Sequence, residues 1–226
     1  MAVRFHLAEH VHTDIIAHSV DGFPVKTAEE FVQLLRAARA SGPGVPRPTP
    51  IESFLAAHPA ALAFIQAPKP IPASFAEESF YAVSAYKFTN QQGVVRFGRY
   101  RIRPEAAGEY LEAGAAAAKP ADFLFDEIRA RLAKGPVRMR IAVQLAAPGD
   151  TVDDATAHWP PDRPETEFGM VELSAVVLDH EQEQRHIIFD PIPRVDGIEP
   201  SADPLLEARA DVYLASGRRR RTQGAK

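Results

Sequence analysis

The sequence contains no cysteine. This absence excludes a disulfide framework, a thiolate metal site and a cysteine nucleophile. The sequence also has no apolar run long enough to cross a membrane, and no signal peptide is recognisable. Positive charge is not in excess, because the formal net charge is −4, so a general attraction to nucleic acid is not expected. We therefore expect neither a membrane nor a nucleic-acid partner, and a cytoplasmic location is the default.

The composition is typical of a soluble globular protein, with 46% hydrophobic and 25% charged residues. A chain of 226 residues can bury a substantial core and suits one domain, or at most two small ones. The prolines cluster at 43–50, 68–72 and 160–164. Periodic apolar segments lie between these clusters, so the clusters indicate loops rather than disorder.

The C-terminal part of the chain carries the most informative pattern. Ser201 can cap a helix with Pro204 in its first turn, and Gly217 is typical of a position just past a helix end. Arg209 and Tyr213 are four residues apart, so they share one face of this helix. A guanidinium beside a phenol favours the phenolate, and an anionic oxygen is a good ligand for ferric haem. The alternative is an amphipathic helix with an ordinary Arg–Tyr pair.

The same region resembles the haem catalases. That family closes its haem site with a Phe-Asp-Pro run, then Gly-Ile-Glu-x-Ser-x-Asp, then Arg-x-x-x-Tyr and a further arginine. The residues that match in order and spacing are Phe189, Asp190, Pro191, Gly197, Ile198, Glu199, Ser201, Asp203, Arg209, Tyr213 and Arg220. The resemblance implies haem b, with its iron, as the cofactor.

The resemblance also implies a role for each matching residue. Tyr213 is expected to be the axial ligand of the iron, with Arg209 and Asp203 as its electrostatic supports. Arg220 is expected to contact a haem propionate, and Phe189 to belong to the haem-binding residues. Larger catalases carry a histidine in this charge network where the present chain has Ser84, so a shorter network is expected.

A second matching region lies near the start of the sequence. The run Asp14 to Ser19, followed by Gly22-Phe23-Pro24-Val25, resembles the small single-domain branch of the family, the catalase-related peroxidases. Phe23 and Phe31 match two phenylalanines that wall the distal side of the haem. His18 stands where typical catalases have an asparagine, and its imidazole could supply a hydrogen-bond donor or a base. His18 is therefore the distal acid–base candidate, although an ordinary buried histidine is the alternative. His6, His10 and His12 lack a carboxylate placed to orient them, so no metal site is expected there.

The family's distal catalytic histidine falls upstream of the strand that begins at Met1. The resemblance covers essentially the whole sequence, yet it enters the family pattern about a quarter of the way along. Two explanations stay open: an internal methionine taken as the start of a longer active protein, or a product that lacks this histidine and two barrel strands. We expect the chain as written to have little or no catalase turnover.

The alternation of apolar and polar residues predicts strands at 1–7, 13–18, 79–89, 94–103, 137–145 and 168–179. Capping boxes at Thr27 and Thr49 predict helices, the second interrupted at His58-Pro59, and further helices are expected at 105–118 and 122–134. A bulge at Gly98 would place Arg96, Arg99, Arg101 and Arg103 together on a solvated face. The predicted fold class is α+β. It consists of a single domain over 1–226 with an antiparallel catalase-like barrel, helical insertions, a C-terminal haem-ligand helix and the first two barrel strands absent.

The resulting prediction is a haem-dependent, catalase-related peroxidase that decomposes hydrogen peroxide or organic peroxides, with a second copy of the chain as the candidate protein partner in a homo-oligomer. Three alternatives remain. The first is an inactive haem-binding fragment, the second a haem-dependent isomerase of fatty hydroperoxides. The third is a nucleic-acid binder using the arginines at 218–221, which the net negative charge disfavours.

Overall fold

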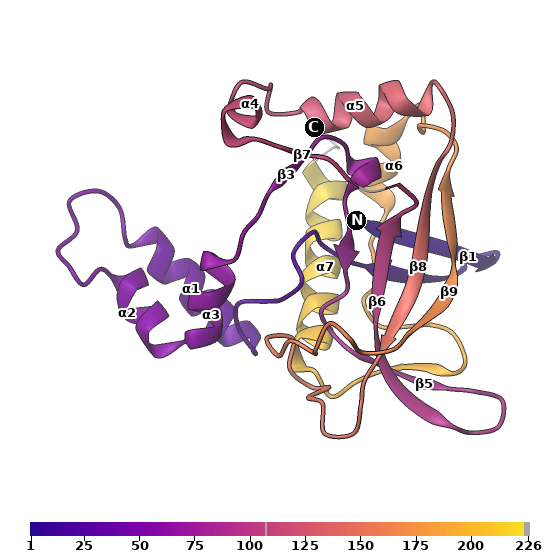
Figure 1. Cartoon of the computed structure of the whole chain (residues 1–226), viewed down its shortest axis with the longest axis horizontal. Coiled ribbons are helices and arrows are strands. Elements are labelled where there is room, and N and C mark those ends of the chain that lie inside the picture. Colours follow the sequence, from indigo (N-terminus) through magenta and orange to yellow (C-terminus); the bar gives the residue numbers. More distant parts are fainter. Residues whose placement is uncertain (107, 224–226) are drawn as a thin grey trace.

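The computed structural model describes residues 1–106 and 108–223. The strands are β1 (Ala2–Ala8), β2 (Val11–Ile16), β3 (Ile71–Pro72), β4 (Phe80–Tyr81), β5 (Tyr86–Thr89), β6 (Val95–Pro104), β7 (Tyr110–Leu111), β8 (Val137–Leu145), β9 (Glu165–Leu173) and β10 (Ile198–Pro200). The helices are α1 (Ala28–Arg39), α2 (Pro50–Ala57), α3 (Pro59–Gln66), α4 (Ala113–Ala117), α5 (Phe123–Leu132), α6 (His180–His186) and α7 (Pro204–Gln223), with a 3₁₀ turn η1 at Phe75–Glu77. The α+β class is therefore confirmed (Figure 1).

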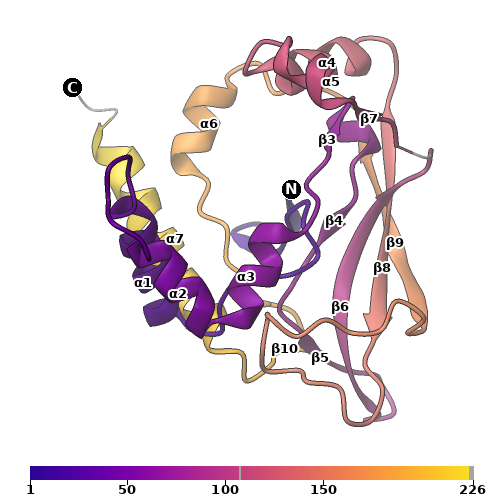
Figure 2. The ribbon, with the colours of Figure 1, turned by 60° about the vertical axis from the view of Figure 1, so that its left-hand side comes forward.

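One antiparallel sheet organises the molecule. Its strands are ordered β10-β5-β6-β8-β9, and β4 also pairs with β6. Apolar side chains of β6 and β8 alternate toward the core, so Ile102, Met139 and Ile141 are almost completely buried. On the far side of the molecule α1 and α7 pack against each other, and Figure 2 shows them together at some distance from the sheet.

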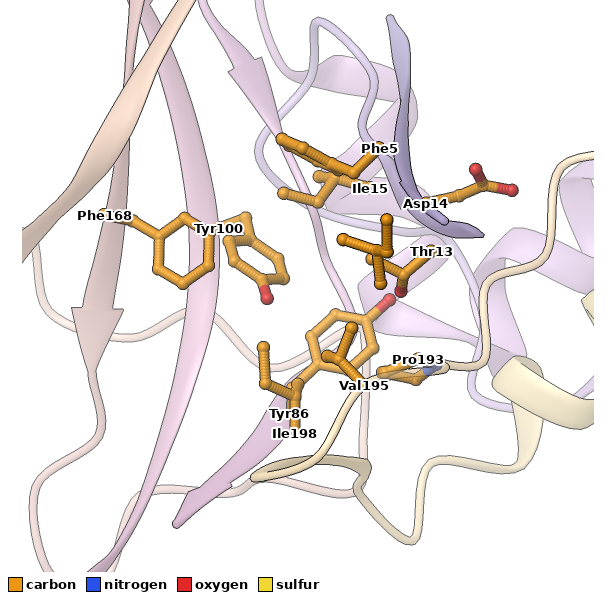
Figure 3. A pocket seen from close by; sticks show the side chains of 11 residues that line it. Phe5, Thr13, Asp14, Ile15, Tyr86, Tyr100, Phe168, Pro193, Val195 and Ile198 are labelled. Atoms are coloured by element: carbon orange, nitrogen blue, oxygen red, sulfur yellow. The ribbon is translucent and has the colours of Figure 1, made fainter. Parts of the chain in front are cut away.

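The expected closed barrel is not present in the described residues. The β1–β2 hairpin forms a separate two-stranded sheet, and β3 pairs only with β7. An apolar hollow of about 160 Å³ remains between the hairpin and the main sheet. Figure 3 shows the side chains that face it from both sides, Phe5 and Ile15 on the hairpin side and Tyr100 and Phe168 on the sheet side. The hairpin thus covers the inner face of the sheet mainly by side-chain packing, with an isolated antiparallel bridge between His18, just after β2, and Tyr81 of β4.

The prediction of a bulge at Gly98 is wrong. Gly98 pairs regularly with Tyr86 on one side and with Leu145 on the other. A side chain at this position would overlap with Val143, which explains the glycine. Because the strand alternates without interruption, Arg99 and Arg101 point away from the core face occupied by Tyr100 and are covered by other parts of the chain.

The prediction that these arginines lie together on a solvated face is therefore also wrong, because two of them are buried. Arg99 and Arg101 are only 2% and 3% exposed. Arg99 donates to the carbonyls of Ala157 and Asp154, and its guanidinium lies 4.3 Å from the Trp159 ring centroid. Burial lowers the pKa of Arg99 to about 10. The loop over 148–164 therefore packs on Arg99, whereas Arg101 donates to Gln144 and pairs with Asp21.

Several predicted boundaries also differ. The strand expected over 79–89 is divided into β4 and β5, because residues 82–85 leave the ladder between them. The helix expected over 105–118 is largely replaced by β7 and the short α4, since β7 pairs with β3. The strand expected to reach residue 179 ends at Leu173. Both capping boxes are confirmed, with Thr27 and Thr49 accepting from the N–H groups of Glu30 and Glu52.

The C-terminal helix α7 is longer than predicted. It continues through Gly217 to Gln223, so Gly217 is not its stop signal. An added side chain at Gly217 would overlap with Ile188, which shows that this glycine permits close packing against the preceding segment. Asp203, not Ser201, caps the helix, because its carboxylate accepts from the Leu205 N–H at 2.9 Å. Within the described residues, no helix is both long and apolar enough to cross a membrane.

Candidate functional site

A cavity of about 500 Å³ lies between α1, α7 and the end of β2, and we call it the α1–α7 cavity. Most of its walls are apolar. The lining residues are Ile16, Ala17, His18, Phe23, Ala28, Phe31, Val32, Val83, Leu205, Ala208, Arg209, Val212 and Tyr213. A mostly apolar cavity of this size with a few polar groups has the character of a small-molecule or cofactor site.

Arg209 and Tyr213 form the polar group on α7. The Arg209 guanidinium donates to the Tyr213 hydroxyl oxygen through Nε at 3.1 Å and through Nη2 at 3.0 Å. The two residues lie one helical turn apart, which is why the sequence spacing predicts their contact. Hydrogen bonds from a cation stabilise negative charge on the acceptor oxygen. The pair therefore lines the cavity with a phenol oxygen that accepts from two N–H groups of a guanidinium.

His18 supplies the imidazole of the cavity. Its Nε2 is buried and has no hydrogen-bond partner among the described residues. Burial, assisted by the charge of Arg209, lowers the pKa of His18 to about 4. The imidazole is therefore neutral at pH 7. Hydrogen bonds between the backbones of His18 and Tyr81, at 3.1 and 2.8 Å, fix the residue beside the main sheet.

Phe23 and Phe31 form an aromatic wall. Their rings are stacked, with centroids 5.5 Å apart, and the His18 and Phe23 ring centroids lie 6.3 Å apart in a T-shaped arrangement. The same two phenylalanines pack against a small core around Val25 and Leu34. Their role in packing and their position in the cavity are thus compatible.

Three residues expected at the site do not line the cavity. Asp203 is 3% exposed, caps α7, and has one carboxylate oxygen without a hydrogen-bond partner among the described residues. Arg220 donates to the carbonyl of Ile187 at 2.6 Å. The Phe189 ring lies against the Arg4 guanidinium, at 5.2 Å. These contacts place Asp203 at the start of α7. They place Arg220 and Phe189 at the segment around residues 187–189, which lies beside the last turns of α7.

Sequence reasoning missed much of the apolar lining. Leu205, Ala208 and Val212 complete the face of α7 that carries Arg209 and Tyr213, and their spacing of three and four residues could have identified them. Val83 gives no such signal, because it belongs to the segment that leaves the ladder between β4 and β5.

The histidines near the hairpin form no metal cluster. His6 and His12 face each other across β1 and β2. Within residues 1–106 and 108–223, no group of three or more His, Cys, Asp or Glu side chains is arranged to hold a metal ion. The expectation that this histidine pattern carries no metal site stays a prediction.

The family-model match and the similar curated proteins point to the same family. A family model described as "Catalase" matches residues 1–226. A catalase-related peroxidase of Mycolicibacterium paratuberculosis is 38% identical over 219 residues, which cover 96% of this chain and 69% of that protein. A catalase-related peroxidase of Synechococcus elongatus is 30% identical over 220 residues, which cover 96% of this chain and 65% of that protein.

Solved structures support the fold. A fungal catalase superposes with a TM-score of 0.80 at 20% identity, covering 97% of this chain and 47% of that one. Catalase A from Saccharomyces cerevisiae superposes with a TM-score of 0.78 at 20% identity, covering 97% and 48%. The chain thus has a catalase-like fold and spans about half the length of these solved catalases.

Proposed function

This chain belongs to the catalase family, and on that premise we propose that it binds haem in the α1–α7 cavity and acts on peroxides. One observation carries the proposal. The cavity brings together five residues that are far apart in the sequence and that the resemblance assigns to the haem site: His18, Phe23, Phe31, Arg209 and Tyr213.

The residues present fit a haem. The apolar walls suit a planar macrocycle, and Phe23 and Phe31 provide an aromatic surface on one side. The Tyr213 oxygen, supported by two N–H donors of Arg209, has the chemistry of an anionic ligand for ferric iron. The unpaired Nε2 of His18 is a buried polar atom that a bound ligand would satisfy.

When bound, haem supplies the iron redox chemistry that peroxide decomposition needs. Tyr213 is the proposed iron ligand, and Arg209 keeps negative charge on its oxygen. Asp203 supports them indirectly by fixing the start of α7. Neutral His18 can accept a hydrogen bond from a peroxide O–H at Nε2, which orients the peroxide. Its low pKa makes it a weak base, so slow turnover is consistent with this geometry.

The nature of the walls also bears on the size of the peroxide that the cavity can accept. The side chains around His18 are apolar, with Ile16, Phe23 and Val32 nearby in the lining. Such a surface accommodates the alkyl part of an organic peroxide as well as hydrogen peroxide. A fatty hydroperoxide is therefore the second candidate substrate, and product analysis separates isomerisation from reduction.

Hemin titration tests the proposal. The purified chain should develop a Soret band with saturable binding, and Tyr213→Phe should lose the tyrosinate character of the spectrum. Tyr110→Phe is the matched control, because Tyr110 lies outside the cavity and its loss should leave the spectrum unchanged. A wild-type chain without a Soret band, or an unchanged spectrum in Tyr213→Phe, contradicts the haem assignment. Hemin binding without peroxide consumption would instead identify an inactive haem-binding protein.

A further inference from the structure

A second hollow, of about 310 Å³, lies beside the α1–α7 cavity. Ser19, Val20 and Asp21 line this second hollow, whereas the flanking residues His18 and Phe23 line the cavity. A single segment of chain therefore separates the two spaces. The remaining walls come from residues 67–70 after α3, and from Glu78, Tyr81 and Tyr110.

Glu78 is the unusual residue of this hollow. It is only 5% exposed, and it has no salt bridge among residues 1–106 and 108–223. Its Oε1 accepts from the Ser79 N–H at 2.8 Å and from the Tyr110 hydroxyl at 3.1 Å. A buried carboxylate is normally paired with a cation, because removing its charge from water is costly. Glu78 thus places a buried carboxyl group, without an ion-pair partner among the described residues, at the wall of a hollow.

Lys69 lines the hollow and the Arg101 guanidinium lies 5.2 Å from the Tyr81 ring centroid, but both cations already have partners within the chain. The Lys69 ammonium donates to the carbonyls of Phe64 and Ala67 at the end of α3, and lies 4.9 Å from the Phe64 ring centroid. Arg101 pairs with Asp21 at 3.2 Å. Asp21 is therefore already paired, and Glu78 is the lining carboxylate without an ion-pair partner among the described residues.

The other walls suit a flat aromatic group. Tyr81 and Tyr110 contribute two aromatic rings, and Pro68 and Pro70 contribute apolar ring surfaces. Aromatic rings attract both other rings and organic cations. The volume is at the lower end of the range for small-molecule sites.

We propose that this second hollow binds a small aromatic amine or amidine, whose positive group pairs with the Glu78 carboxylate while its ring packs against Tyr81 and Tyr110. The site is separate from the α1–α7 cavity, and its occupation does not require haem. The two spaces are nevertheless connected structurally, because the backbone of Tyr81 is hydrogen-bonded in both directions to that of His18.

The test uses three ligands of similar shape and different charge: benzylamine, benzyl alcohol and benzoate, each titrated into the full chain at pH 7 and followed by NMR chemical shifts. We expect saturable binding of benzylamine with an affinity about tenfold or more above that of benzyl alcohol. Only the amine carries a positive charge that can form a charged hydrogen bond with the Glu78 carboxylate. Benzoate should not bind. The shifts should map to Ser19–Asp21, Tyr81 and Tyr110.

Glu78→Gln is the diagnostic variant. Its amide oxygen can still accept from Ser79 and Tyr110, so the fold is retained, but the preference for benzylamine over benzyl alcohol should disappear. Glu183→Gln, an exposed position on α6, is the control and should bind as the wild type does. The proposal is overturned if benzylamine does not saturate, if benzyl alcohol binds equally well, or if Glu78→Gln keeps the preference. None of these readouts depends on hemin, so they separate this site from the proposed function.

Discussion

Among single residues, Arg209 is the one whose charge is expected to control the candidate site. Both of its hydrogen bonds to Tyr213 end on the same phenol oxygen. The spacing of these two residues in the sequence already predicts their contact, because residues four apart on a helix share one face. The sequence could not predict that Arg220 donates to the Ile187 carbonyl, since only the folded chain brings these two residues together. The Asp203 cap is local by contrast, because its partner, the Leu205 N–H, lies two residues further along the chain.

Replacing Arg209 with Leu should weaken hemin binding, and the weakening should grow as the pH is lowered from 9 to 5. Without the guanidinium, protons compete more effectively with iron for the Tyr213 oxygen. Hemin titrations at several pH values measure the effect, with Arg209→Lys as the control that retains the positive charge. A leucine variant whose affinity follows the wild-type pH profile would refute the role of Arg209.

His18 gives a prediction that needs no haem. Because its pKa is lowered to about 4, its imidazole signal in NMR should stay constant between pH 5.5 and 8, while exposed histidines titrate. The unfolded chain binds this proton near the ordinary pKa of about 6.5. His18 therefore costs stability as the pH falls from 6.5 toward 4, and it has no such effect above 7.

His18→Asn should flatten the acid side of the stability profile. Urea unfolding of the wild type and the variant at pH 4.5 and pH 7.5 measures the difference. Equal loss of stability on acidification in both proteins would show that His18 is not the residue responsible. His10→Asn, at an exposed position of the hairpin, is the matched control.

Among the elements, β6 and α7 both differ from their sequence-based description at a glycine. A lone glycine in a strand suggests a bulge, and a glycine late in a helix suggests its end. In this fold Gly98 and Gly217 are instead positions where another side chain approaches the backbone too closely for a Cβ. The neighbouring side chain, Val143 or Ile188, comes from a distant part of the sequence, so no local sequence pattern identifies it. The capping boxes of α1 and α2 were predictable because all their partners lie within three residues.

Gly217→Ala should destabilise the protein by about 1–3 kcal/mol, although alanine is the better helix former, because the new methyl group overlaps with Ile188. Gly114→Ala is the matched control, since Gly114 lies in α4 with open space around its Cα. That variant should be neutral or slightly stabilising. Urea unfolding measures both, and Ile188→Ala should partly rescue Gly217→Ala. Equal behaviour of the two glycine variants would contradict the close packing of α7.

In the whole molecule, the α1–α7 cavity is built from β2, α1, α7 and the segment between β4 and β5. A ligand that binds all of these at once should stabilise the native state. Hemin at 100 times its dissociation constant would contribute about 2.7 kcal/mol, which corresponds to a rise in Tm of roughly 5–10 °C for a chain of this size. Thermal unfolding followed by circular dichroism measures it. The rise should be much smaller in Tyr213→Phe, and a rise of equal size would argue for non-specific hemin binding.

The topology as a whole was only partly predictable. The long strands β6 and β8 and the hairpin follow from alternation, whereas closure into a barrel depends on which strands meet at the seam. No pattern within one strand specifies that meeting, and β1–β2 in fact packs on the sheet by Phe5 and Ile15. A continuous strand over 79–89 is predicted because this stretch is rich in aromatic and β-branched residues, but residues 82–85 leave the ladder. There Val83 lines the cavity and the Ala82 carbonyl accepts from Arg101.

The main sheet ends at β9, whose nine residues have a strand neighbour on one side only within the described part of the chain. Phe168 and Met170 on this strand are 47% and 53% exposed. Such an edge offers free main-chain groups to any extended polypeptide, including a second molecule of the same kind. Samples should therefore lose monomer with second-order kinetics as they are concentrated, and a lysine in place of Met170 should slow that loss. Handling in dilute solution is the practical consequence for every binding and spectroscopic measurement on this protein.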